Sequence, residues 1–253
     1  MKVCEGPGEL KDALASHRRA GRSIGFVPTM GALHAGHLSL VDRARRENDV
    51  VAVSIFVNPT QFDDEGDLEA YPRSLESDRR LLDGAGAHLL FLPPADHLYA
   101  DGYRFKVSEG SLSRELEGAH RPGHFDGVLT VVLKLLGLVG ADRAYFGEKD
   151  WQQYLLIRDM ARAFFLDTRI VPCPSVREED GLAMSSRNAR LTPEDRQRAP
   201  ALHRILRGEG SADKKRTRLE QAGFSVDYVE RRGDRLLAAV TLGEVRLIDN
   251  VEL

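Results

Sequence analysis

The chain has 253 residues, enough for one large domain or for a large and a small one. Hydrophobic residues make up 42% and charged residues 30%, as in soluble globular proteins, and the formal net charge of −3 argues against nucleic acid as a bulk partner. The two cysteines are too few for a disulfide framework or a zinc site, so we expect a reducing, cytoplasmic setting.

The first residues lack the apolar core of a signal peptide, and strand and helix patterns then alternate along the chain. The strand patterns cover 22–28, 49–57, 87–93, 141–146 and 168–173, and the helix patterns cover 36–48, 73–86, 125–139 and 150–164. The apolar run at 128–140 is too short to span a bilayer and is interrupted by Lys134. This order predicts an α/β fold with a doubly wound, Rossmann-like parallel sheet.

The pattern changes near residue 175. A loop rich in charged and small residues covers 177–191. A helix pattern, "TPEDRQRAPALHRIL" at 192–206, follows it with Thr192 as the N-cap and Pro193 in the first helical position. A charged helix and strands joined by glycine-containing turns complete the chain. We therefore expect two domains, a nucleotide-binding domain over 1–175 and a small α+β lid over 176–253.

The stretch "PTMGALHAGHLSLV", 28–41, lies where the first of these strand patterns gives way to a helix pattern. Gly36 allows a ligand to approach the backbone closely, and the N-terminus of a helix favours an anion. His34 and His37 would lie on the same side of that helix and suit phosphate recognition. Two ordinary surface or core histidines would give the same pattern.

The stretch "YFGEKDWQQ", 145–153, also follows a predicted strand. Gly147 would lie at the carboxyl end of the sheet, where open α/β folds bind ligands. Lys149 and Asp150 could then serve phosphate and ribose, and Gln153 could face the same cleft. The alternative is an ordinary helix start with an acidic first turn.

Other polar groups have weaker patterns. The loop "MSSRN", 184–188, could grip phosphates or could simply be a solvated loop. Asn58 and Gln61 end a buried strand and offer amides to a hydroxylated substrate, although Asn-Pro also marks an ordinary turn. The turn at 120–125 is either a flap or a plain loop, and Asp78 could help to hold magnesium bound to triphosphate.

Two of these stretches resemble the signature motifs of nucleotidylyltransferases. The histidine pair after the strand pattern at 22–28 resembles the HIGH signature, and the Met-Ser-Ser-Arg loop after the strand pattern at 168–173 resembles the KMSKS signature. The resemblance extends over nearly the whole chain to the pantothenate synthetase (pantoate–β-alanine ligase) family. It is carried by the motifs "FVPTMGALHAGHLSLV", "IFVNPTQF", "YPRSLESD", "HRPGHFDGV", "YFGEKDWQQ", "VREEDGLAMSSRN" and "RLIDNVEL".

The resemblance implies particular roles. His37 is the proton donor and a phosphate contact, His34 helps to stabilise the transition state, and Lys149 contacts the phosphates. Gln61 and Gln153 hold pantoate, with Asn58 and Met30 nearby. The ATP site as a whole comprises Met30, Gly31, Ala32, Leu33, His34, Ala35, Gly36, His37, Gly147, Glu148, Lys149, Asp150, Val176, Met184, Ser185, Ser186 and Arg187.

The resemblance implies the ATP-dependent ligation of (R)-pantoate to β-alanine through pantoyl adenylate, with Mg²⁺ present. It also implies a cytoplasmic homodimer that binds neither nucleic acid nor a membrane. The sequence departs from the family pattern in two places. Ser77 stands where some members have a further acid, and the C-terminal region is shorter than expected. A nucleotidyltransferase acting on phosphate esters and a non-catalytic nucleotide-binding regulator remain the alternatives.

Overall fold

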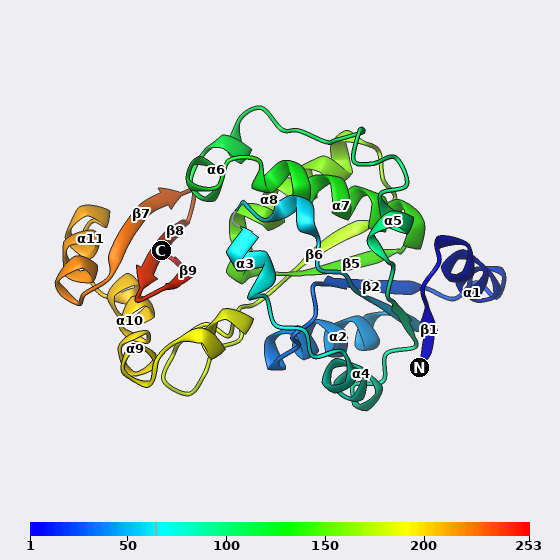
Figure 1. Cartoon of the computed structure of the whole chain (residues 1–253), viewed down its shortest axis with the longest axis horizontal. Coiled ribbons are helices and arrows are strands. Elements are labelled where there is room, and N and C mark those ends of the chain that lie inside the picture. Colours follow the sequence, from blue (N-terminus) through cyan, green and yellow to red (C-terminus); the bar gives the residue numbers. More distant parts are fainter. Residues whose placement is uncertain (64) are drawn as a thin grey trace. The chain divides into compact units, whose positions relative to one another are not determined.

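A computed structural model describes residues 1–63 and 65–253 (Figure 1). The chain forms two compact units. Unit 1 comprises Met1–Gly147 and Gln152–Cys173, and unit 2 comprises Glu148–Trp151 and Pro174–Leu253. The short segment Glu148–Trp151 therefore packs with the C-terminal residues, although a Rossmann-like domain over 1–175 would include it.

Unit 1 is built on a sheet of six parallel strands in the order β1-β4-β3-β2-β5-β6. The strands are β1 (Lys2–Cys4), β2 (Ile24–Thr29), β3 (Val50–Ile55), β4 (Leu89–Phe91), β5 (Arg143–Gly147) and β6 (Arg169–Cys173). The strand order reverses between β2 and β5, which are hydrogen-bonded neighbours. In open α/β sheets, ligands bind at such a reversal, beyond the carboxyl ends of the strands.

Helices cover both faces of this sheet, with α2 and α4 on one face and α7 and α8 on the other (Figure 1). The longer helices of unit 1 are α1 (Pro7–Arg19), α2 (Ala35–Glu47), α4 (Leu75–Gly84), α7 (His124–Val139) and α8 (Trp151–Ala163). The shorter ones are η1 (Pro59–Gln61), α3 (Glu65–Glu69), α5 (Ala95–Leu98), η2 (Leu112–Arg114) and α6 (Glu117–His120). The predicted α/β class with a doubly wound parallel sheet is confirmed.

The core between the sheet and α2 is formed by buried aliphatic side chains, among them Val27, Val41, Val51 and Val53. Such β-branched residues favour strands that are covered on both faces. At the edge of this cluster, the buried Tyr145 keeps its hydroxyl hydrogen-bonded to polar groups at the C-terminal end of α2. The helices and strands that carry the predicted site residues are thus fixed by packing.

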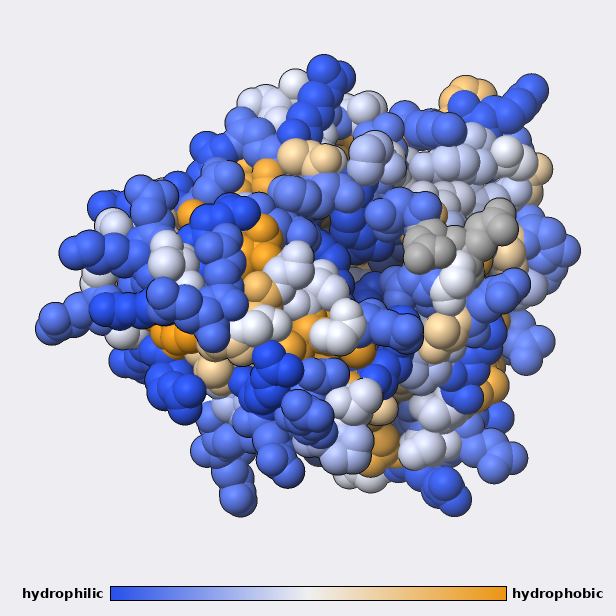
Figure 2. Space-filling view, turned by 60° about the vertical axis from the view of Figure 1, so that its left-hand side comes forward, coloured by the Kyte–Doolittle hydropathy of each residue, from blue (hydrophilic) through white to orange (hydrophobic). Residues whose placement is uncertain are grey.

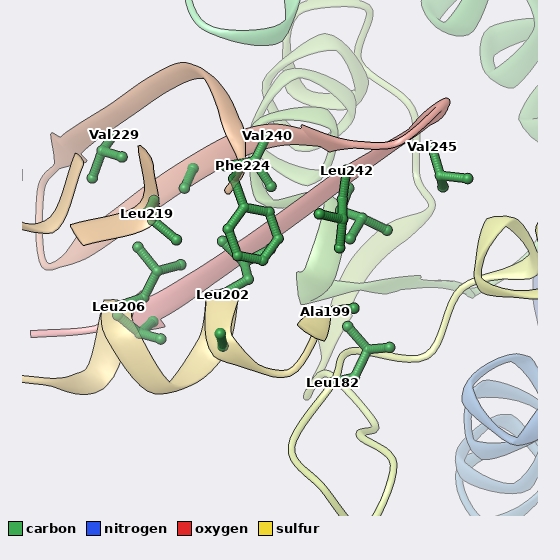
Figure 3. Close-up of a cluster of buried hydrophobic side chains, with 14 of the residues drawn as sticks. Leu182, Ala199, Leu202, Leu206, Leu219, Phe224, Val229, Val240, Leu242 and Val245 are labelled. Carbon is green, nitrogen blue, oxygen red and sulfur yellow. The ribbon is translucent and has the colours of Figure 1, made fainter. Parts of the chain in front are cut away.

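Unit 2 contains an antiparallel sheet of three strands in the order β7-β8-β9. These strands, β7 (Ser225–Arg232), β8 (Arg235–Leu242) and β9 (Val245–Glu252), are joined by turns in which Gly233 and Gly243 adopt positive φ angles of 59° and 58°. The remaining elements are η3 (Glu148–Asp150), η4 (Ser186–Arg190), α9 (Pro193–Arg198), α10 (Ala201–Arg207) and α11 (Ala212–Gln221). Leu202, Leu219 and Phe224 face Val240 and Leu242 of the sheet in one apolar core (Figure 3).

The helix that follows Thr192 was predicted correctly at its start and incorrectly in its length. Thr192 caps α9 as expected, because its hydroxyl accepts the N–H of Asp195 at 3.1 Å. The helix predicted to continue from there is divided into α9 and α10 next to Pro200, whose ring has no N–H to continue the hydrogen-bond ladder. The sequence patterns did not identify β1 and α1.

The face of the molecule drawn in Figure 2 is mostly hydrophilic, and its hydrophobic residues form small separate patches. Among the residues that the structure describes, no helix has the length and apolar character needed to cross a membrane.

Candidate functional site

The loop between β2 and α2 contains two residues in the left-handed region, Gly31 (φ 83°) and Ala32 (φ 50°). Glycine adopts this conformation without steric cost, whereas an alanine needs support from its surroundings. The carboxylate of Asp78 provides it by accepting the N–H groups of Ala32 and Leu33, both at 2.9 Å. Asp78 is buried in the first turn of α4, so it fixes the path of the chain just before His34.

His34 and His37 bond to the N-terminal turn of α2 through one nitrogen of each ring. Nδ1 of His34 accepts the N–H of Gly36 at 3.1 Å, and Nδ1 of His37 accepts the N–H of His34 at 3.4 Å. The ring centroids are 4.1 Å apart. Because Nδ1 is an acceptor in each neutral ring, the ring proton is on Nε2. Two N–H donors therefore belong to a helix N-terminus, which itself favours an anion.

Asp78 has a structural role that the sequence patterns did not reveal. Besides the two backbone N–H groups, it accepts the hydroxyl of Ser74 at 3.1 Å. Among the described residues, no group of three or more His, Cys, Asp or Glu side chains is arranged to hold a metal ion. The magnesium contact of Asp78 stays a prediction. Its Oδ1 accepts both the N–H of Leu33 and the hydroxyl of Ser74, so a metal contact would fall to Oδ2, which accepts the N–H of Ala32 and has a second lone pair.

Asn58 is buried three residues after the end of β3, and both ends of its side-chain amide are hydrogen-bonded within unit 1. Its Nδ2 donates to Oε1 of Gln61 at 3.0 Å and to the carbonyl of Gly127 at 3.2 Å. Its Oδ1 accepts the hydroxyls of Tyr99 at 2.7 Å and Thr60 at 3.0 Å. Asn58 therefore holds the side chain of Gln61 in one orientation.

Gln61 is held from three further directions. Its Nε2 lies 3.2 Å from Sδ of Met30, and its carbonyl lies 2.7 Å from Nδ1 of His124. A Cβ added to Gly127 would come within 2.7 Å of Cα of Gln61 and 2.3 Å of the Thr60 carbonyl, so α7 packs directly on η1 there. The structure thus brings Met30, Asn58 and Gln61 together, while their contacts with pantoate stay predictions.

His124 belongs to the turn that the sequence left open as a flap or a plain loop. It is the first residue of α7 and is buried. Burial, and next the charge of Arg121, lower its pKa to about 4. The ring is therefore neutral near pH 7, so one of its nitrogens carries a proton that Nδ1 can donate to the Gln61 carbonyl. No spacing rule marked this residue, because its role depends on a carbonyl that is distant in the sequence.

The two adjacent glutamines of α8 have different environments. Gln152 is buried, accepts the N–H of Glu117 at 3.0 Å and donates to the carbonyls of Leu112 at 2.7 Å and Glu115 at 2.8 Å. Gln153 is only partly buried. Gln152 therefore ties α8 to η2 and α6, while Gln153 stays the predicted pantoate contact.

In unit 2, the residues Val176 and Met184 are paired across a short hairpin, where the N–H of Met184 donates to the Val176 carbonyl at 3.0 Å. Ser185 follows and caps η4, since its hydroxyl accepts the N–H of Arg187 at 3.3 Å. Lys149 lies in η3 of the same unit, with Nζ 3.8 Å from a carboxylate oxygen of Asp150. Their contacts with a nucleotide stay predictions.

Comparison with known proteins places these observations in a family. The family model described as pantoate-beta-alanine ligase matches residues 2–252. The chain is 51% identical to the pantothenate synthetase of Bdellovibrio bacteriovorus over 252 residues, which are 100% of this chain and 99% of that one. The two chains thus have nearly the same length, so the short C-terminal region is not peculiar to this protein. A Legionella pneumophila pantothenate synthetase is 49% identical over 90% of each chain.

Solved structures agree with the sequence relatives. A Francisella tularensis pantoate-beta-alanine ligase, described as complexed with beta-gamma ATP and beta-alanine, has a TM-score of 0.95 and 40% identity, covering 100% of this chain and 97% of that one. A Thermus thermophilus pantothenate synthetase has a TM-score of 0.91 and 45% identity, covering 100% and 99%. The chain belongs to the pantoate–β-alanine ligase family of enzymes.

Proposed function

We propose that this ligase joins (R)-pantoate to β-alanine in two steps, with pantoyl adenylate as the intermediate and AMP and pyrophosphate as the products beside pantothenate. The observation that carries the proposal is the pair His34 and His37, whose rings cap the helix that follows a central strand of a parallel sheet. The Francisella relative, which is described with an ATP ligand and β-alanine, supports it.

A carboxylate is a poor acylating agent because it has no good leaving group, so it has to be activated before an amine can attack its acyl carbon. The pantoate carboxylate attacks the α-phosphorus of ATP and pyrophosphate leaves. The amine of β-alanine then attacks the acyl carbon, and AMP leaves as the new carbon–nitrogen bond forms. We assign to His34 and His37 the donation of hydrogen bonds to phosphate oxygens on which charge develops.

Pantoate is held by neutral amides in this proposal. Gln61 and Gln153 bind it, and Asn58 acts through Gln61, whose side chain it orients at 3.0 Å. Positioning of this kind brings the carboxylate to the phosphorus and lowers the entropic part of the barrier. A phosphorylated acceptor would favour Arg or Lys as its direct ligands in place of these amides. The guanidinium of Arg121, 3.4 Å from the Gln61 carbonyl, is paired with Asp63 at 2.8 Å.

We assign the nucleotide contacts to Met30–His37, Gly147–Asp150, Val176 and Met184–Arg187, with Lys149 on the phosphates. Magnesium, when bound, would neutralise the leaving pyrophosphate. Mg²⁺ commonly binds through substrate phosphates and only one or two carboxylates, and Asp78 is the carboxylate that we assign.

Three further features belong to the proposal. Residues 1–175 and 176–253 would act as a nucleotide-binding domain and a lid, the enzyme would work as a homodimer, and it would reside in the cytoplasm. Light scattering tests the second of these. A particle of twice the chain mass of 28.1 kDa is expected, and a 28.1 kDa particle would contradict it.

Isotope exchange tests the reaction itself. With ATP, Mg²⁺ and pantoate alone, the enzyme should exchange labelled pyrophosphate into ATP, and omission of pantoate should abolish the exchange. Addition of β-alanine should then release AMP and pantothenate in equal amounts. A transferase acting on phosphate esters would show no exchange that depends on pantoate, and a regulator that only binds nucleotide would show none at all.

A further inference from the structure

Two polar residues near the end of the chain, Asp249 and Asn250 in β9, are 3% and 4% exposed. They belong to the motif "RLIDNVEL", to which the proposed function assigns no role. A buried charge and a buried amide lower stability unless every polar atom finds a partner. Their partners in unit 2 therefore indicate what the two side chains do.

Asn250 binds the main chain of η3. Its Nδ2 donates to the carbonyls of Glu148 at 2.8 Å and Lys149 at 3.1 Å, and its Oδ1 accepts from Nη1 of Arg235 at 2.7 Å. Arg235 in turn donates to Oε2 of Glu148 at 2.8 Å and lies 4.0 Å above the ring of Trp151. The backbone that carries Lys149 is thus held by side chains of β8 and β9.

Asp249 binds the hairpin that leads to Met184. Its two oxygens accept from the guanidinium of Arg177 at 2.8 and 2.9 Å, and its Oδ2 lies 3.2 Å from Nδ1 of His203. Burial opposes ionisation of Asp249, but the nearby side chains of His203 and Arg177 outweigh this effect, so the pKa of Asp249 lies below its usual value. Arg177 pairs with Ala183, the residue before Met184.

The apolar core of unit 2 does not need this polar pair for hydrophobic stabilisation. Fifteen buried hydrophobic residues of unit 2 already form that core, and ten of them are labelled in Figure 3. Replacement of a buried ionic group by apolar side chains is often neutral or stabilising, whereas polar partners fix geometry. The adjacent side chains of Asp249 and Asn250 reach two separate segments, and both segments are assigned to the nucleotide.

We propose that Asp249 and Asn250 are positioning residues for ATP. Asn250 sets the backbone of Glu148 and Lys149, so that the ammonium group of Lys149 meets the phosphates. Asp249 sets Arg177 and with it the start of the Met184–Arg187 loop. The inference rests on the proposed function, because it requires that these two segments contact the nucleotide.

The experiment compares Asn250→Asp and Asn250→Leu with the wild type. The first variant keeps an acceptor for Arg235 and loses both donors to the η3 carbonyls, and the second loses all three bonds. We measure pantoate-dependent pyrophosphate exchange, the KM for ATP and for pantoate, and thermal stability. Each lost hydrogen bond predicts a rise of about tenfold in the KM for ATP, with the KM for pantoate unchanged.

Asp227→Asn is the matched control. It removes the charge partner of Arg246, 2.8 Å away on the same sheet, an ion pair that involves neither η3 nor the hairpin. A purely structural role of Asn250 predicts that both KM values change together with melting temperature in all of these variants, and that result would overturn the inference.

A double-mutant cycle with Lys149→Ala identifies the route of the effect. If Asn250 acts through Lys149, Asn250→Asp should change the KM for ATP far less in the Lys149→Ala background than in the wild type. An undiminished effect would contradict the inference. Should Lys149→Ala alone leave the exchange unchanged, the proposed role of Lys149 fails instead. Asp249→Asn, which keeps the side-chain shape, tests the other segment and should also raise the KM for ATP.

Discussion

His34 and His37 cap one helix reciprocally, each through Nδ1, and their ring centroids are 4.1 Å apart. This relationship separates two roles within a single side chain. Nδ1 stabilises the N-terminus of α2, whereas the proposed chemistry belongs to Nε2. The two roles can be separated by a substitution whose side chain still caps the helix but has no donor at the position of Nε2.

His34→Asn is that variant, because asparagine is a good N-cap residue. We expect the melting temperature to stay close to that of the wild type, while pyrophosphate exchange falls by about two to four orders of magnitude through loss of a donor to the phosphate. His34→Ala should lose both the cap and the activity. His97→Asn, at an exposed position in α5, is the control. Exchange near the wild-type rate in His34→Asn would show that His34 only caps the helix.

Asp78→Asn tests how the loop before His34 is held. An amide cannot accept hydrogen bonds at both of its ends, so one of the two N–H groups at 2.9 Å would face an NH₂ group. We expect a loss of about 1–3 kcal/mol in the free energy of unfolding and a lower kcat. Chemical denaturation and steady-state kinetics measure the two effects.

The same variant tests the magnesium prediction. If Asp78 also contacts the metal, Asp78→Asn should raise the Mg²⁺ concentration needed for half-maximal exchange. An unchanged Mg²⁺ requirement together with reduced stability would leave Asp78 with its structural role alone.

Sequence patterns predicted the central strands of unit 1 well because those strands are apolar on both faces, as at Val50–Ile55. They failed where one residue interrupts a regular pattern. Pro200 divides a helix that hydrophobic spacing alone would continue. The affiliation of Glu148–Trp151 with unit 2 was also invisible, because it depends on Asn250 and Arg235, far away in the sequence.

For the candidate site too, some residues could be predicted from the sequence and others could not. His34, His37 and Gln61 were identified because their residue types and the motifs around them suggest chemistry by themselves. The supporting roles of Asp78 and His124 were missed, since both depend on hydrogen bonds to backbone groups of another segment. A sequence shows which groups could react, and only the fold shows what holds them.

Gln152 and Gln153 provide a matched pair for the pantoate site. Gln152→Ala removes three hydrogen bonds, one accepted from the N–H of Glu117 and two donated to the carbonyls of Leu112 and Glu115, so we expect a lower melting temperature. Gln153→Ala should leave stability nearly unchanged and raise the KM for pantoate by about tenfold, the equivalent of one lost hydrogen bond. If Gln153→Ala changes the KM for ATP and not that for pantoate, the assignment of the pocket is wrong.

The depressed pKa of His124 predicts a dependence of stability on pH. Its pKa is about 4 in the folded chain, against an ordinary value near 6.5, because of burial and the charge of Arg121. The hydrogen bond to the Gln61 carbonyl and the charges of Glu117 and Asp63 act in the opposite direction. The unfolded chain therefore binds this proton more tightly. The stability contribution is complete above pH 6.5 and is lost as the pH falls towards 4, by about 2–3 kcal/mol at pH 4.5.

His124→Gln removes this titration while an amide N–H can still reach the Gln61 carbonyl. Urea unfolding at several pH values between 7 and 4.5 should show a smaller loss of stability for the variant than for the wild type. His97→Gln, at an exposed position in α5, is the control and should follow the wild-type curve. If the wild type and His124→Gln lose stability in parallel, His124 takes up its proton equally well in the folded and unfolded chains, and the lowered pKa assigned to it is wrong.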